Sequence, residues 1–178
     1  MDIESILISN RSKIQIQNII DTIIENPQKL EELIKILMDK NLSSIHYRAA
    51  WVLGYLAPLG NDAFQKYWKF LLELLKKEDQ HPTITRSITR LFQKLKLPEK
   101  YHGQLIDISF NILTSEKQSL AQRANTMTIL FNYSRKYPDI QNELRYVIQE
   151  LLKFKSEASI QSRGIKILNQ LNKIHNEH

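Results

Sequence analysis

The segment from Ile45 to Leu59 reads IHYRAAWVLGYLAPL. Its apolar residues recur at the spacing i, i+4, i+7, i+8 and i+11, which is the buried stripe of an amphipathic helix. The members of this stripe are Ile45, Ala49, Val52, Leu53 and Leu56. Arg48 and the aromatic residues Tyr47, Trp51 and Tyr55 lie outside the stripe, so the segment predicts a helix with one buried side and one aromatic side.

The same stripe recurs along the chain. Copies begin at Ile84, Leu120 and Ile160, and a fainter copy begins at Ile8. The five starting points are separated by 37, 39, 36 and 40 residues. Between the stripes lie further amphipathic segments, at 28–39, 62–77, 103–115 and 140–154. One period therefore holds a pair of helices, which is typical of helical repeat proteins.

The composition favours a folded, all-helical protein. Of the 178 residues, 42% are hydrophobic and 25% are charged, with only four Gly, five Pro and no Cys. These values favour helix and exclude a disulfide framework or a thiol nucleophile. The first residues lack the basic region of a signal peptide, and no apolar run approaches the roughly 18 residues of a membrane span. We therefore expect an all-α protein in the cytoplasm, without a membrane partner.

An Arg followed by a small residue marks the stripes. The pairs are Arg11–Ser12, Arg48–Ala49, Arg123–Ala124 and Arg163–Gly164, with Arg86–Ser87 one position early. A small residue allows a neighbouring helix to approach closely. Each Arg is preceded by an acid near the turn into its helix, and these acids are Glu4, Asp39, Asp79, Glu116 and Glu157. We predict that acid and Arg pair and favour the helix N-terminus, by about 0.3 to 1 kcal/mol.

The motif YRAAWVLGYL at 47–56 resembles the second helix of a HEAT repeat, whose pattern is V-R-x-x-A-x-x-x-L-G. The matching residues are Arg48, Ala49, Ala50, Leu53 and Gly54. This resemblance to small HEAT-like, ARM-type proteins implies an α-solenoid with the stripe helices on the concave side. We expect one domain, 1–178, with nine or ten helices in a right-handed superhelix of about four and a half helical-hairpin repeats. The expected repeats are 1–26 as a partial cap, 27–60, 61–97, 98–137 and 138–178.

Charge is distributed unevenly over the predicted helices. The inner segments 43–60, 81–97, 118–137 and 158–176 contain eleven of the 25 Lys and Arg residues and none of the 19 Asp and Glu residues. A helical wheel points part of these side chains away from the stripe, toward the concave solvent face. The predicted partner-binding residues are Tyr47, Trp51, Tyr55, Arg86, Arg90, Lys94, Tyr133, Lys166 and Lys173. The same wheel predicts Gln122, Thr126 and Leu130 to be exposed.

We interpret the protein as a monomeric, non-catalytic interaction module that binds an acidic protein segment on this basic, aromatic face. The alternative is nucleic-acid binding by the same face, with Trp51 stacking on bases and Arg90 and Lys94 contacting phosphates. A purely structural alternative is that Tyr47, Trp51 and Tyr55 cover the adjacent helix.

Catalytic and cofactor motifs are missing from the sequence. There is no Walker loop, dinucleotide fingerprint, nucleophile elbow or H-E-x-x-H motif, so we expect no cofactor and no metal. The enzymatic alternative within this architecture is a HEAT-like alkylpurine DNA glycosylase. That chemistry needs a carboxylate near the base, and Asp21 is the only acid predicted on the exposed face of the first stripe.

Overall fold

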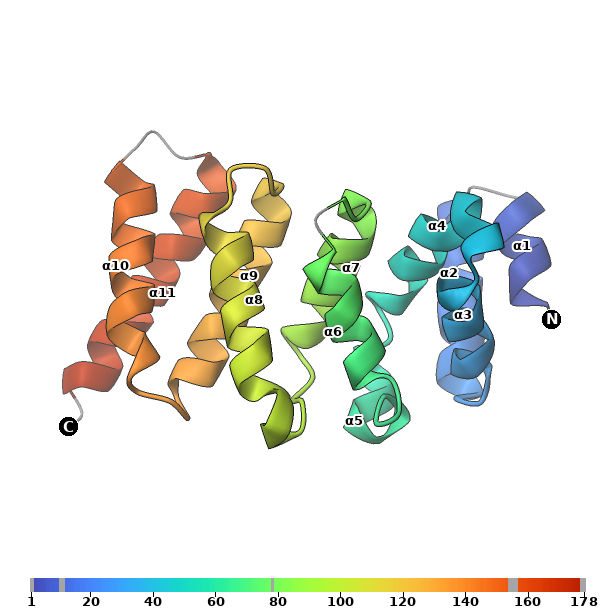
Figure 1. The fold of residues 1–178 in the computed structure, drawn as a ribbon, viewed down its shortest axis with the longest axis horizontal. Coiled ribbons are helices and arrows are strands. Elements are labelled where there is room, and N and C mark those ends of the chain that lie inside the picture. The colour runs from blue at the N-terminus through green and yellow to red at the C-terminus, as the bar shows by residue number, and fades with distance from the viewer. Residues whose placement is uncertain (1, 10–11, 78, 154–156, 177–178) are drawn as a thin grey trace. The chain divides into compact units, whose positions relative to one another are not determined.

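The computed structural model describes residues 2–9, 12–77, 79–153 and 157–176. Within these ranges the chain forms helices and no strand, which confirms the all-α prediction (Figure 1). It divides into two compact units, Met1–Leu97 (unit 1) and Pro98–His178 (unit 2). The boundary between the units falls where the sequence places the boundary between its repeats 61–97 and 98–137. The single domain stays a prediction.

Unit 1 is built around α4 and α7. Its α-helices are α1 (Ile3–Ser9), α2 (Lys13–Glu25), α3 (Lys29–Met38), α4 (Ser43–Leu53), α5 (Gly60–Ala63), α6 (Trp68–Lys76) and α7 (Pro82–Phe92). Two 3-10 helices, η1 (Lys40–Leu42) and η2 (Ala57–Leu59), precede α4 and α5. α4 packs against α2, α3 and α7, while α6 packs against α7 and α1 against α3 and α4. The helix that carries the aromatic side is therefore the central helix of the unit.

Unit 2 has four longer helices after the 3-10 turn η3 (Glu99–Tyr101). They are α8 (His102–Thr114), α9 (Leu120–Ser134), α10 (Ile140–Lys153) and α11 (Ala158–Asn176). α9 packs against α8, α10 and α11, and α10 packs against α11. Leu113, Met127 and Leu144 are fully buried in the core that these helices share.

The buried stripes at 45–56 and 84–95 are confirmed. All five residues of each stripe are buried, and Ala49, Leu53, Ile88 and Leu91 are fully inaccessible to solvent. Neither stripe contains a polar residue, so helix packing buries apolar area at about 25 cal/mol per Å² without unpaired polar groups.

The predicted number of helices is wrong. The described residues form eleven α-helices instead of nine or ten. The segment 62–77, predicted as one helix, is divided between α5 and α6. In the turns between them, the N–H of Phe64 donates to the carbonyl of Asn61 (3.0 Å), and the N–H of Tyr67 donates to that of Phe64 (2.8 Å). These bonds span three residues instead of four, so the α-helical ladder is interrupted.

The first stripe also differs from the prediction. Ile8 is 59% exposed, whereas Ile16 and Ile19 are buried. Ser12 is the N-cap of α2, and its hydroxyl accepts the N–H of Gln15 at 3.3 Å. A cap residue has non-helical backbone angles, so no helix runs through Ser12. Arg11 lies outside the described residues.

Candidate interaction surface

Two small residues bring α4 and α7 into close contact. A Cβ added to Gly54, at the C-cap of α4, would lie 3.1 Å from Ser87 Cβ and 3.2 Å from the Ser87 Cα and carbonyl oxygen. Ser87 is itself buried in the middle of α7. A side chain at position 54 would therefore push the two helices apart. This close approach lets side chains on α4 contact side chains on α7 beside the contact point.

The aromatic side chains of α4 and of Tyr55, two residues beyond its end, make those contacts. The guanidinium carbon of Arg90 lies 4.7 Å from the ring centre of Tyr55. At the other end of the helix, Tyr47 stacks on His81, with 5.3 Å between the ring centres and 26° between the planes. Tyr47 and Trp51 are half-buried and Tyr55 is 43% exposed. We call Tyr47, Trp51, Tyr55, Arg86 and Arg90 the α4–α7 surface.

The environment of Tyr55 is electropositive. Burial opposes ionisation of the Tyr55 hydroxyl, but hydrogen bonds from Trp51 and Arg90 and the charges of Arg90 and Arg86 lower its pKa below the ordinary value of 10.0. The segments that form the surface, 43–60 and 81–97, contain no Asp or Glu. The structure thus brings together five predicted site residues from two helices. The sixth on unit 1, Lys94, is exposed just beyond the end of α7.

Arg48 does not belong to this surface. It is only 7% exposed, and its Nη1 donates to the backbone carbonyl of Leu7 in α1. Its Nε donates to the Tyr47 hydroxyl at 3.2 Å. Among the described residues it forms no ion pair with Asp39, whose carboxylate instead accepts the N–H of Asn41 at 2.9 Å. The predicted Asp39–Arg48 pair is therefore wrong, because the buried carbonyls at the end of α1 offer Arg48 a closer acceptor.

Other members of the Arg pattern behave similarly. Arg123 Nε donates to the carbonyl of Leu113, in the last turn of α8, at 2.8 Å. Arg163 Nη1 donates to the hydroxyl of Thr128 on α9. Carbonyls in the last turn of a helix lack partners within that helix and carry the negative end of its dipole, so they attract a cation. Each of these Arg residues tethers two helices, since Arg48 joins α4 to α1, Arg123 joins α9 to α8, and Arg163 joins α11 to α9. The predicted pairs of Arg86 with Asp79 and of Arg163 with Glu157 stay predictions.

The prediction for α9 is wrong. Tyr133 was predicted to be exposed but is 7% exposed, and its ring meets the His102 ring edge-on at 4.7 Å between centres. His102 Nδ1 is also within 2.8 Å of the Tyr137 hydroxyl. The other buried residues predicted to be exposed are Gln122, Thr126 and Leu130.

Each of these residues has a partner within unit 2. The side-chain oxygen of Gln122 accepts the N–H of Ser119 (2.6 Å) in a capping box. The Thr126 hydroxyl donates to the carbonyl of Arg123 (2.8 Å), and Leu130 belongs to the apolar core. α9 packs against three helices, so no broad side of it remains for solvent.

The predicted residues on α11 are exposed. Lys166 and Lys173 border a shallow depression along one side of this helix, together with Ser162, Ile165, Asn169 and Gln170. Ile165 is 52% exposed, which the wheel did not predict. Unit 2 therefore retains two of its three predicted site residues at its surface.

A family model described as HEAT repeat domain matches residues 3–171. The chain belongs to the HEAT repeat family. HEAT repeats generally act as protein-interaction scaffolds, and the family is typically non-enzymatic. Neither a search of the curated proteins nor a search of the solved structures found a match.

His81 contacts the α4–α7 surface through its stack on Tyr47, and the sequence did not predict this contact. It precedes Pro82 at the N-cap of α7, where its Nδ1 accepts the N–H of Thr83 at 3.2 Å. The apolar stripe of this helix begins at Ile84, so its periodicity gives no orientation for His81, three residues earlier. The available signal was the His-Pro pair, since Pro is favoured in the first turn and the residue before it is a candidate cap.

Asp21, metal binding and membrane insertion are the remaining points that the sequence raised for this HEAT repeat protein. Asp21 is exposed on α2, and its carboxylate accepts the side-chain N–H of Gln17 at 2.8 Å. In the part of the chain that the structure describes, no three His, Asp or Glu side chains cluster as metal ligands. None of the helices described is both long and apolar enough to span a bilayer.

Proposed function

We propose that the protein is a non-catalytic interaction module and that the α4–α7 surface binds an acidic segment of a partner protein. The observation that carries the proposal is the position of Arg90, which lies over the Tyr55 ring on segments that contain no Asp or Glu. A guanidinium carries five N–H donors, so Arg90 can contact Tyr55 and still donate to a carboxylate. Arg86 adds a second cation four residues earlier on the same helix.

The aromatic contacts favour a protein partner over nucleic acid. Base stacking requires an open ring face. One face of Tyr47 is occupied by His81, and Arg90 lies over the ring of Tyr55. These rings therefore position the cations, which also agrees with the alternative that they cover the neighbouring helix. Carboxylate recognition by the Arg edges needs no further ring face.

Three further expectations from the sequence are part of the proposal. They are a right-handed superhelix of about four and a half repeats, the location of the binding residues on its concave side, and a cytoplasmic location. Lys94 on unit 1 and, separately, Lys166 and Lys173 on unit 2 are exposed cations, and each adds positive charge to the surface of its own unit.

The test is fluorescence anisotropy of a labelled peptide of alternating Glu and Gly, titrated with the full chain. We expect binding that weakens with added salt, since exposed charges are screened over about 8 to 10 Å at 0.1 to 0.15 M salt. The Arg86→Ala plus Arg90→Ala variant should bind roughly tenfold more weakly.

The matched control is Lys13→Ala plus Lys117→Ala, which removes the same charge from exposed positions outside the surface. If both variants lose the same affinity for the peptide, binding depends only on the net charge of the protein, and the proposal is contradicted. A thymidine oligonucleotide of the same length is titrated in parallel. If the oligonucleotide binds more tightly than the peptide, and binds the Arg86→Ala plus Arg90→Ala variant more weakly than the wild type, the ligand is a nucleic acid and not an acidic protein segment.

A further inference from the structure

Unit 1 contains a small cavity outside the α4–α7 surface. Its volume is about 100 Å³, and it lies among α3, α4, α6 and α7. Most of its lining is apolar and consists of Leu37, Met38, Phe70, Leu74 and Ile84. Leu37, Leu74 and Ile84 are buried, whereas Met38 is 50% exposed at the end of α3. An unbranched, polarizable side chain in this position can move to admit a ligand.

Two of the three polar side chains that line the cavity are hydrogen-bonded to backbone carbonyls of the chain. His46 Nε2 is hydrogen-bonded to the carbonyl of Asp39, and Gln80 Nε2 donates to the carbonyl of Leu74 at 3.3 Å. Lys77 is exposed, and its ammonium makes no hydrogen bond or ion pair with the residues that the structure describes. Lys77 is therefore the one charged lining group that can receive a ligand.

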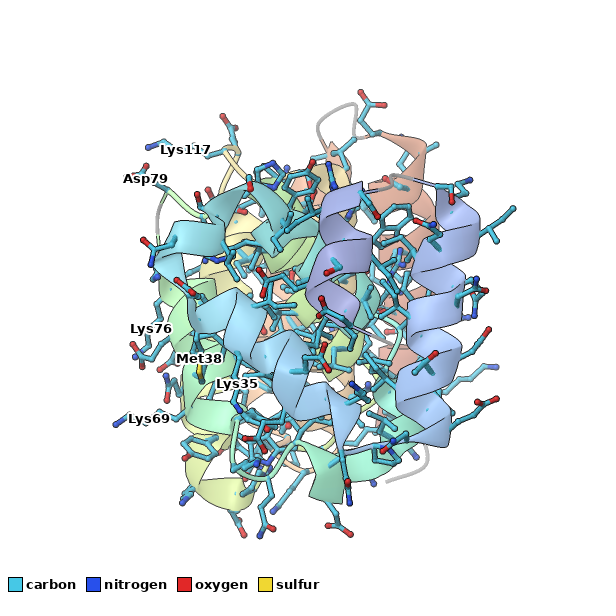
Figure 2. The ribbon with its side chains drawn as sticks, turned by 90° about the vertical axis from the view of Figure 1, so that its right-hand side faces the viewer. Lys35, Met38, Lys69, Lys76, Asp79 and Lys117 are labelled. Carbon is cyan, nitrogen blue, oxygen red and sulfur yellow. The ribbon has the colours of Figure 1, made fainter. Side chains whose placement is uncertain are left out.

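The surroundings carry charges of both signs. Met38 lies along one edge of unit 1 with Lys35, Lys69, Lys76 and Asp79 (Figure 2). Lys35 pairs with Glu31 at 3.3 Å and Lys76 with Glu73 at 3.2 Å. Lys69 and Lys77 have no such partner among the described residues. Of the two, only Lys77 lines the cavity, so an acidic residue of an approaching segment would pair with Lys77.

We propose that this cavity binds a leucine side chain from a partner protein segment and that an acidic residue beside this leucine pairs with Lys77. An apolar cavity of about 150 Å³ holds a molecule as large as benzene, so about 100 Å³ suits a branched aliphatic group. A resident water would need two to four polar partners, and His46 and Gln80 are already engaged. Enclosed pockets that receive one apolar anchor typically dominate the energy of an interface. The site is independent of the proposed function of the α4–α7 surface.

The test is methyl NMR of the full chain with the probe acetyl-Glu-Leu-Glu-amide. We expect a saturable shift of the Met38 methyl signal, with a Kd on the order of 1 mM for so small a probe. Acetyl-Glu-Ala-Glu-amide should bind at least about tenfold more weakly, because it leaves the cavity unfilled. Acetyl-Lys-Leu-Lys-amide should also bind more weakly, because its charges oppose Lys77. Lys77→Ala should weaken binding of the first probe roughly threefold.

Two variants separate binding from folding. Leu74→Phe fills the cavity from within and should abolish the response. Met38→Glu changes an exposed side chain at the cavity, and its charge repels the acidic probe; binding to this variant is followed by the methyl signals of Leu37 and Ile84, which also line the cavity. Lys69→Ala, an exposed change on α6 that does not line the cavity, should leave the affinity for the first probe unchanged. The proposal is overturned if Met38 does not respond to the first probe, if the leucine and alanine peptides bind equally, or if Met38→Glu binds as the wild type does.

Discussion

Tyr55 is the residue at which the two halves of the α4–α7 surface meet. Tyr55 follows the end of α4, and Trp51 of α4 and Arg90 of α7 both lower the pKa of its hydroxyl, while the guanidinium carbon of Arg90 lies 4.7 Å from its ring centre. Sequence periodicity predicted that Trp51, Tyr55 and Arg90 lie outside the buried stripes. It did not predict that they contact one another, because a helical wheel describes one helix and says nothing of the rotation of its neighbour.

The pKa of Tyr55 provides a direct measurement of these contacts. Because it is lowered, the folded state favours the phenolate, so Tyr55 adds stability as pH rises through its folded pKa toward 10.0, and this contribution is lost as pH falls below the folded pKa. Arg90→Leu should raise the pKa of Tyr55, measured by carbon-13 NMR of its Cζ. Lys94→Leu removes an exposed cation from the residues that follow α7; Lys94 is not among the groups that lower the Tyr55 pKa, so the titration should be unchanged. An unshifted titration in Arg90→Leu would contradict the contact.

Arg48 is the residue that connects α1 to the rest of unit 1. From a buried position, its Nη1 donates a hydrogen bond to the backbone carbonyl of Leu7, which lies 41 residues earlier in the chain. Arg48→Met keeps the apolar bulk but leaves the Leu7 carbonyl without this donor, which should cost about 1 to 3 kcal/mol. Hydrogen exchange of the α1 amides should accelerate more than that of the α6 amides. The exposed change Arg135→Met is the control, and equal exchange in both variants would show that α1 does not depend on Arg48.

At the scale of whole elements, the distance between α4 and α7 depends on Gly54. Gly54→Ala places a methyl group 3.1 Å from Ser87 Cβ, so the helices must separate, at an expected cost of about 1 to 3 kcal/mol of unfolding free energy. Gly103→Ala is the control, because nothing lies within 4 Å of its added Cβ, and helix propensity favours Ala by about 0.5 to 1 kcal/mol. Chemical denaturation measures both variants. The prediction fails if Gly54→Ala is as stable as Gly103→Ala.

The elements also differ in how far the sequence determines their exposure. The stripes of α4 and α7 could be predicted, since their buried positions are all apolar and regularly spaced. α9 could not be, because its polar residues Gln122 and Thr126 satisfy their hydrogen bonds locally and are buried as well. A polar residue predicts exposure only when water is its best hydrogen-bonding partner.

For the molecule as a whole, we expect a monomer. Large exposed apolar residues include Ile8 and Ile14 on unit 1 and Ile165 on unit 2. Ile14 has the exposed polar neighbours Lys13 and Gln17. Apolar residues scattered singly among polar ones rarely drive association.

Sedimentation equilibrium should therefore give a mass of 21.0 kDa. Ile14→Ser should change neither this mass nor the unfolding free energy by more than about 0.5 kcal/mol. A dimer that dissociates in Ile14→Ser would identify α2 as an interface between copies and contradict this expectation.

The sequence by itself determined the helical class, the repeat period and the buried sides of α4 and α7. These properties follow from the spacing of apolar residues, because that spacing defines the side of a helix that is buried, whichever helix packs against it. Only the tertiary structure decided the partner of Arg48, the burial of Tyr133, the stack of His81 on Tyr47 and the cavity beside Met38. Each of these depends on the distance and rotation between helices that are separate in the sequence, and packing of whole side chains sets those quantities.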